Sequence, residues 1–138
     1  MKNVLFSGFV AAALLLATPA IAKVYVCQLK DQSNSGWIPE VAVVDYDEST
    51  GVITVLDPII EHYKEAAIPG RIATKNDKRI TFAWVLDNFS ARAPGRNQFV
   101  SGMRYRLTIQ NSSLRATITA KPNGYRNDFR GKGQCEIR

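Results

Sequence analysis

The chain has 138 residues, of which 46% are hydrophobic and 22% are charged, and it carries a formal net charge of +6 at pH 7. The hydrophobic fraction is that of a folded protein and excludes an intrinsically disordered chain. The length predicts one domain with a single modest core.

Residues 1–22 have the pattern of a secretory signal peptide, with Lys2 in a short first region, then an apolar run, and an Ala-Ile-Ala cleavage site at residues 20–22. The apolar run ends before Pro19 and is too short to span a membrane, and no second apolar segment follows. We therefore expect an exported, periplasmic or extracellular protein without a transmembrane helix. Its mature chain is predicted to be a single β domain of residues 23–138.

The two cysteines, Cys27 and Cys135, lie near opposite ends of the mature chain. In an oxidising compartment a single pair of cysteines normally forms a disulfide. Free thiols or a metal site are the alternatives, but the pair has no nearby histidine and no Cys-x-x-Cys spacing, so it is a poor zinc set. We expect the disulfide, and with it a first and a last strand that are close neighbours.

Short segments with strand-like alternation follow the signal peptide. The first five are residues 24–30, 39–47, 52–56, 71–75 and 79–87. In the second segment the alternation is ambiguous, because either the even-numbered or the odd-numbered side chains from Val41 to Tyr46 could face inward. In the fifth segment the even-numbered side chains, from Ile80 to Leu86, are predicted to face the core.

Two turns and one helix are predicted between these strands. Residues 47–51 form a turn in which Gly51 can adopt the left-handed conformation, and Asn76-Asp77 forms a second, tight turn. Residues 58–67 are predicted to form a short helix, with Asp57 as its N-cap and Pro58 in its first turn.

Residues 99–110 and 113–121 are predicted to form a β-hairpin, because apolar and polar side chains alternate on both arms. The apolar face consists of Met103, Tyr105, Leu107 and Ile109 on the first arm, and of Leu114, Ala116, Ile118 and Ala120 on the second. If Asn111-Ser112 is the two-residue turn, Ile109 faces Leu114. Residues 88–98, just before the hairpin, are predicted to form a mobile loop.

With a final strand at residues 133–137, the strand count is about eight, and neighbouring strands are expected to be antiparallel. Many short strands with joined ends predict an all-β, barrel-like fold. A two-sheet sandwich is the alternative. The expected disulfide favours the barrel, because pairing the first strand with the last removes both edges of the sheet.

No catalytic, cofactor or metal site is predicted. The single histidine, His62, lies on the expected helix, and the sequence contains none of the common nucleophile, phosphate-binding or zinc motifs. Asp45 and Asp47 are spaced like the start of a calcium loop, but Thr50 and Leu56 stand where such a loop needs glycine and glutamate. We therefore expect a protein that is not an enzyme.

Positive charge is concentrated in the C-terminal part of the chain. Residues 23–91 hold seven Lys or Arg against ten Asp or Glu, whereas residues 92–138 hold ten against two. The anion-binding candidates are Arg104, Arg106, Arg115 and Lys121 on the outer hairpin face, and Arg126, Arg130 and Lys132 after it. Arginine binds phosphate and carboxylate groups through two parallel hydrogen bonds, so these residues favour an anionic partner. A solvated polar face is the alternative.

The expected function is binding or envelope association through this basic sheet face. The expected partner is an anionic envelope component, such as a lipid headgroup or a cell-wall polymer, or an acidic protein. Nucleic acid fits poorly, because the aromatic side chains alternate inward instead of lying among the arginines, where they could stack on bases. A lipocalin-like carrier of a small ligand is an alternative, unless side chains such as Phe82 and Trp84 fill the interior of the barrel.

Two sets of short motifs resemble known proteins. Tyr25-Val26-Cys27 and Gly133-Gln134-Cys135 are similar to the ends of small exported bacterial β proteins with one disulfide, a type to which no activity is attached. Residues 101–105, Ser-Gly-Met-Arg-Tyr, resemble the Ser-Gly-x-x-Tyr stretch of the periplasmic inhibitors of c-type lysozyme, which are small eight-stranded barrels. This resemblance implies a hydrolase inhibitor in which Ser101 lies on a loop that enters the active-site cleft of the enzyme. The second motif of that family, a tyrosine followed shortly by Lys-Gly, is not present downstream.

Overall fold

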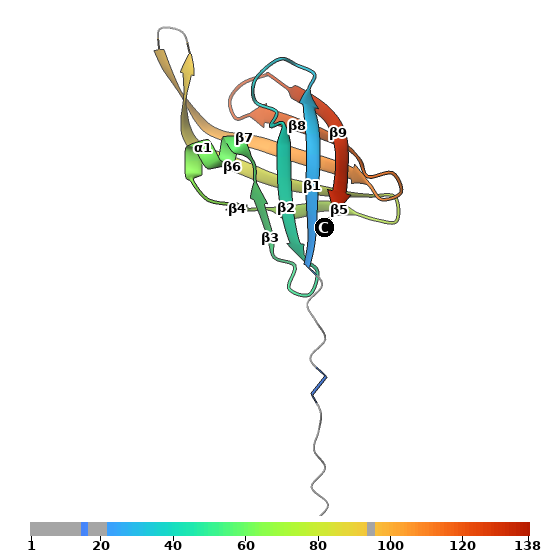
Figure 1. The fold of residues 1–138 in the computed structure, drawn as a ribbon. Coiled ribbons are helices and arrows are strands. Elements are labelled where there is room, and N and C mark those ends of the chain that lie inside the picture. The colour runs from blue at the N-terminus through green and yellow to red at the C-terminus, as the bar shows by residue number, and fades with distance from the viewer. Residues whose placement is uncertain (1–14, 17–21, 94–95) are drawn as a thin grey trace, which may run out of the picture.

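The computed structural model describes residues 15–16, 22–93 and 96–138. The predicted signal peptide therefore lies outside the described residues, apart from residues 15–16 and Ala22. The described residues form nine strands and one helix (Figure 1). These are β1 (Ala22–Asp31), β2 (Val41–Asp47), β3 (Ile53–Leu56), α1 (Pro58–Lys64), β4 (Ile68–Pro69), β5 (Arg71–Lys75), β6 (Arg79–Ala93), β7 (Arg96–Gln110), β8 (Arg115–Pro122) and β9 (Phe129–Ile137).

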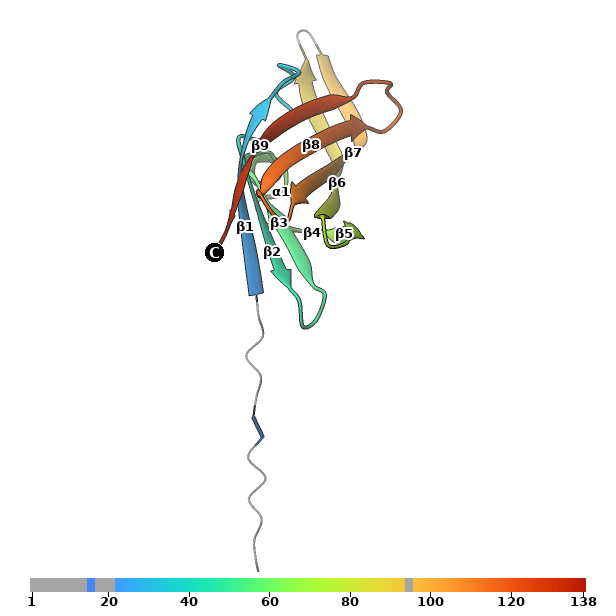
Figure 2. The ribbon, with the colours of Figure 1, turned by 90° about the vertical axis from the view of Figure 1, so that its right-hand side faces the viewer.

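The strands form one antiparallel sheet in the order β4-β3-β2-β1-β9-β8-β7-β6-β5, which curls into a nearly closed barrel (Figures 1 and 2). The barrel-like all-β prediction is therefore confirmed. The first and last strands are neighbours, and the edges that remain are β4 and β5. These two strands are consecutive in the chain and are separated only by Gly70. Together they form one bent strand that connects the β3 end of the sheet to the β6 end.

The predicted disulfide between Cys27 and Cys135 is present, with an S–S distance of 2.08 Å. The two cysteines are directly paired across β1 and β9 and are both buried. Figure 2 shows β9 running beside β1. Gly131, Gly133 and Cys135 are successive residues on the inner face of β9, and a Cβ atom on Gly133 would overlap the backbone oxygen of Gln28. Glycine is needed here because the backbones of β1 and β9 approach each other closely.

Side chains fill the interior of the barrel. The side chains predicted to face inward from residues 79–87 and from the hairpin are buried, except Leu114, which is half-buried and lies in the turn before β8. The ambiguity in β2 is resolved with Ala42, Val44 and Tyr46 facing inward. Aromatic rings pack at the centre, with Phe82 in edge contact with Tyr25 at 5.2 Å between ring centroids and with Tyr46 at 5.9 Å. Such packing gives the sheet one continuous core.

The predicted turn of the β7–β8 hairpin is wrong, because the two strands pair with a register shifted by two residues. Ile109 pairs with Ala116, not with Leu114, and Thr108 pairs with Thr117. The turn is longer because Leu114 adopts a left-handed backbone, with φ of 57°, and its N–H donates to the Gln110 carbonyl at 2.9 Å. A shift of two residues leaves every side chain on its predicted face, since strand side chains alternate with a period of two.

Residues 88–98 do not form the predicted loop. Outside residues 94–95, β6 and β7 continue through this segment as a two-stranded arm that projects from the barrel (Figure 1). Asn88, with φ of 44°, interrupts the ladder between the pairs Asp87–Gly102 and Phe89–Val100. Phe89 is buried against Trp37 and Tyr63 at ring distances of 5.5 and 4.7 Å, which fixes the base of the arm.

The short helix α1 begins as predicted and ends three residues earlier, at Lys64. The Asp57 carboxylate caps it, because Oδ1 accepts hydrogen bonds from the N–H groups of Ile59 and Ile60, both at 2.8 Å. Glu65 caps its C-terminus with a left-handed φ of 60°. Within the part of the chain that the structure describes, no helix is long and apolar enough to cross a membrane. The predicted left-handed Gly51 is confirmed, with φ of 76°.

Candidate functional site

Two arginines flank Ala83 on the outer face of the sheet. Ala83 on β6 pairs with Arg71 on β5 and with Arg106 on β7. Because neighbouring strands lie about 4.8 Å apart, the two arginine backbones are about 10 Å apart, with only an alanine methyl group between them. Two guanidinium groups can therefore reach over the same small floor.

The next row of outward residues holds two cations side by side. Val85 on β6 pairs with Arg104 on β7, which pairs in turn with Lys121 on β8. Arg104 and Lys121 are both exposed and directly opposite each other. Like charges in directly opposed positions of an antiparallel pair repel each other and reduce the stability of the sheet.

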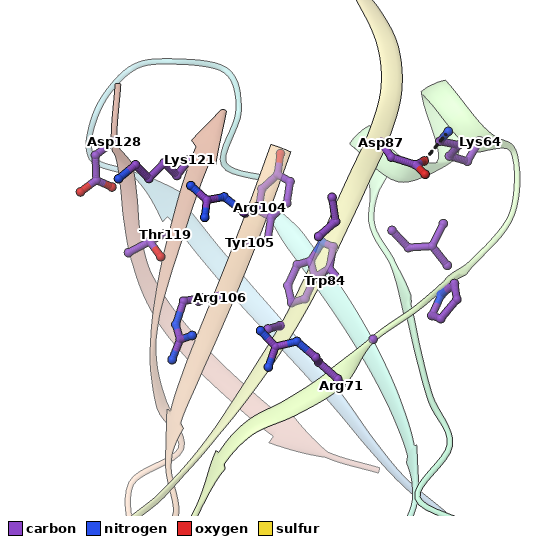
Figure 3. A pocket seen from close by; sticks show the side chains of 15 residues that line it. Lys64, Arg71, Trp84, Asp87, Arg104, Tyr105, Arg106, Thr119, Lys121 and Asp128 are labelled. Carbon is purple, nitrogen blue, oxygen red and sulfur yellow. Dashed lines mark ion pairs between the residues drawn. The ribbon is translucent and has the colours of Figure 1, made fainter. Parts of the chain in front are cut away.

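These two rows border a groove of about 650 Å³ on the outside of the barrel (Figure 3). One wall is the bend between β4 and β5, residues 68–71, and the other is formed by β7 and β8. Ala83 and Val85 lie between the walls. The Val85 side chain is 49% exposed, although outward positions of a solvated sheet are normally polar.

The charges that line the groove do not balance. Its two carboxylates already have partners, because Asp87 pairs with Lys64 at 2.9 Å and Asp128 pairs with Arg130 at 3.0 Å. The hydrogen bond from Lys64 lowers the pKa of the Asp87 carboxyl and so favours its ionised form. Four cations remain without an ion pair to any described residue: Arg71, Arg104, Arg106 and Lys121. The groove therefore presents net positive charge to solvent.

The seven basic residues predicted as anion-binding candidates are divided by the fold. Arg104, Arg106 and Lys121 line the groove, and Arg130 contacts it through its ion pair with Asp128. The other three, Arg115, Arg126 and Lys132, are exposed but do not line it.

The groove residues that the sequence-based prediction missed include Lys64, Arg71 and Val85. Arg71 and Lys64 reach the groove only through the bend between β4 and β5 and the helix before it, which the sequence pattern does not reveal. Val85 could have been found, because it is an apolar residue at an outward position of a strand whose inward positions were already assigned.

Ser101, the residue singled out by the resemblance to lysozyme inhibitors, is exposed. The resemblance implies a loop position, but Ser101 lies within β7, opposite the irregularity at Asn88. His62 is exposed on α1 with its ring 4.7 Å from that of Tyr63. Among the described residues, no three His, Cys, Asp or Glu side chains gather as a possible metal site.

Two smaller cavities lie at opposite ends of the barrel. One, of about 150 Å³, is lined mainly by Trp37, Met103, Tyr125 and Phe129 at the end that carries the arm. The other, of about 210 Å³, lies beside Lys23, whose ammonium group pairs with Glu48 at 2.7 Å. Both are much smaller than the groove, and the residues that line them carry less net positive charge than those that line the groove. The groove is therefore the candidate site.

Comparison with known proteins gives no matching family model, no matching curated protein and no matching solved structure.

Proposed function

We propose that the protein is an exported, non-enzymatic binding protein that holds an anionic partner in the groove. The observation that carries this proposal is the direct pairing of Arg104 with Lys121, without a carboxylate partner for either among the described residues. An anion placed over the two side chains would relieve their repulsion and accept charge-assisted hydrogen bonds from both.

The position of the other cations supports the same proposal. Arg71 and Arg106 lie on strands that are paired on at least one side, so little backbone conformational freedom is lost when a ligand binds. Arginine forks suit the planar oxygens of phosphate and carboxylate groups. The proposed partner is therefore an anionic component of the cell envelope. The buried disulfide is consistent with an oxidising compartment.

A pair of double variants with equal charge loss tests the proposal. We expect Arg104→Gln with Lys121→Gln to weaken binding to vesicles that contain an anionic phospholipid by at least about tenfold, because two charge-assisted hydrogen bonds are lost. The control is Arg115→Gln with Lys132→Gln, which removes the same charge from the same sheet outside the groove. It should weaken binding by less than about threefold, through long-range attraction alone.

The melting temperature of each variant should be measured with its affinity. The groove variant should melt no lower than the unmodified protein, since it removes a repulsive pair. Equal weakening by both double variants would mean that binding depends only on net charge, and it would overturn the groove as the site.

A further inference from the structure

We propose that the groove binds an anionic amphiphile, that is, a phosphate or carboxylate head joined to an aliphatic body. This inference rests on the proposed function, because it takes the unpaired cations Arg104, Arg106 and Lys121 as the site of the head. It adds a second part of the site that recognises the body. The evidence is the apolar surface that lies beside the cations in the same groove.

Apolar groups occupy the side of the groove next to the bend. Ile68, Pro69 and Gly70 form this wall, and Val85 on β6 faces it from the floor. Figure 3 shows Arg104, Arg106 and Lys121 on one side of the groove and the Lys64–Asp87 pair on the other. Lys64 and Asp87 neutralise each other, so among the described residues Arg71 is the one unpaired cation that lines the far side, and the three cations opposite outnumber it as the site of the head.

The exposure of Val85 is the strongest sign of an apolar ligand group. Its side chain is 49% exposed while it stands directly beside Arg104 in the cross-strand pairing. Ala83, two residues earlier on the same face and paired with Arg71 and Arg106, is only 4% exposed. Covering Val85 in the same way would remove apolar surface from water, which favours binding of an aliphatic group at this point.

The size of the groove fits one small molecule. Ligand sites commonly have volumes of about 300 to 1,000 Å³, with mostly apolar linings and a few fixed polar groups. The groove has about 650 Å³ and combines both kinds of lining. A head over Arg104, Arg106 and Lys121 places the attached carbons over Val85, toward Ile68 and Pro69. Each methylene that is fully buried there should raise affinity by about fourfold.

Titration calorimetry with three probes tests this inference on the oxidised protein. The probes are dodecyl phosphate below its micelle concentration, inorganic phosphate, and dodecyl maltoside as a neutral amphiphile of the same chain length. We expect dodecyl phosphate to bind at least about tenfold tighter than either of the other two, since only it engages both parts of the groove.

Two valine variants locate the site of the aliphatic body. Val85→Thr keeps the shape of the side chain and replaces one methyl group with a hydroxyl group, so it should lower the affinity ratio of dodecyl phosphate to inorganic phosphate by at least about fivefold. The control is Val52→Thr, a valine that is 59% exposed and does not line the groove. It should leave this ratio unchanged.

The outcomes separate this inference from the proposed function. If dodecyl phosphate binds no tighter than inorganic phosphate, if dodecyl maltoside binds equally well, or if the two valine variants behave alike, the amphiphile inference is overturned. Binding to anionic vesicles without binding to monomeric dodecyl phosphate would also overturn it. In each case the proposed function still stands if Arg104→Gln with Lys121→Gln weakens phosphate or vesicle binding, and it falls if that variant has no effect.

Discussion

The barrel closes on itself in two places that are built in different ways. Between β1 and β9 the closure is a long ladder from Tyr25–Ile137 to Asp31–Gly131, fixed by a disulfide and by glycines on the inner face. Between β4 and β5 the closure is a bend at Gly70, and β4 forms only two pairs with β3. The first closure leaves no space between its strands, whereas the second has a groove beside it.

Backbone chemistry explains the difference. Pro69 has no N–H group to donate, so it belongs at an edge where the ladder ends. Gly70 then connects β4 to β5, and its N–H donates to the Ile53 carbonyl at 3.0 Å. The comparison indicates that the fully paired closure determines the fold, while the weakly paired closure provides the candidate site. Variants at both closures and at the helix before the bend can break or sharpen this comparison.

The largest effect is expected for Gly133→Ala. Its new Cβ would overlap the backbone oxygen of Gln28, which cannot move without breaking the β1–β9 ladder. We expect a loss of at least about 4 kcal/mol in the free energy of unfolding, or no folded protein. Urea denaturation followed by circular dichroism measures this loss.

Gly70→Ala is the matched substitution at the other closure. Its Cβ would lie 3.0 Å from methyl groups of Ile53 and Val55, which can shift because they belong to side chains. We expect a loss of about 1 kcal/mol. If Gly70→Ala destabilises the protein as much as Gly133→Ala, the two closures are equally rigid and the comparison fails.

The second largest effect is expected from removing the disulfide. Cys27→Ala with Cys135→Ala should lower the free energy of unfolding by about 3 kcal/mol, because the bond joins residues 108 apart and restricts the unfolded chain. Urea denaturation of the double variant, and of the protein with and without reductant, measures the loss. An intact mass that does not rise by two hydrogens on reduction would show that the disulfide is not formed in solution.

The smallest effect concerns Asp57, which caps the helix before the bend. Burial raises the pKa of its carboxyl, although the N–H groups of Ile60 and Ile59 oppose the shift, and Oδ2 has no hydrogen-bond partner among the described residues. A raised pKa means that the folded state binds the proton more tightly than the unfolded state. Stability is therefore lost as the pH rises from about 4 through the raised value.

Asp57→Asn removes this titration and keeps an oxygen for the cap. Its stability relative to the unmodified protein should therefore increase as the pH rises from about 4 to 7, measured by urea denaturation at several pH values. Asp31→Asn is the opposite control. Burial also acts to raise the pKa of Asp31, but hydrogen bonds from Ser33, Ser35 and Gly36 outweigh it and lower the pKa. Because this pKa is lowered, the control acts below about pH 4, where its variant should lose stability relative to the unmodified protein as the pH rises toward about 4. The same direction for both variants, each in its own pH window, would contradict this explanation.

The inner faces of the barrel could be predicted from the sequence because they depend on a local pattern. The alternation from Ile80 to Leu86 and from Met103 to Ile109 needs no knowledge of partner strands. The β7–β8 register could not be predicted, because it depends on the left-handed Leu114, a residue type that rarely adopts this backbone. The arm was missed because a Pro-Gly pair suggests a loop even where strands continue on both sides.

The groove could be predicted only in part. Its β7 and β8 cations follow from the hairpin alternation, so Arg104, Arg106 and Lys121 were identified. Arg71 could not be assigned to the same site, because its position beside Ala83 depends on the pairing of β5 with β6 across a β-bulge. Residues that meet through long-range pairing leave no periodic signal in the sequence.

The pairing of β1 with β9 also determines when the chain can fold. When the chain emerges with its N-terminus first, Cys27 appears before its partner Cys135, which follows 108 residues later. Until β9 arrives, β1 has one bare edge that could pair with another chain. Contacts between such distant residues form slowly, so all-β domains of this kind fold in milliseconds to seconds. Residues 129–137 therefore complete the sheet, and the time for which the bare edge is exposed depends on how soon they arrive.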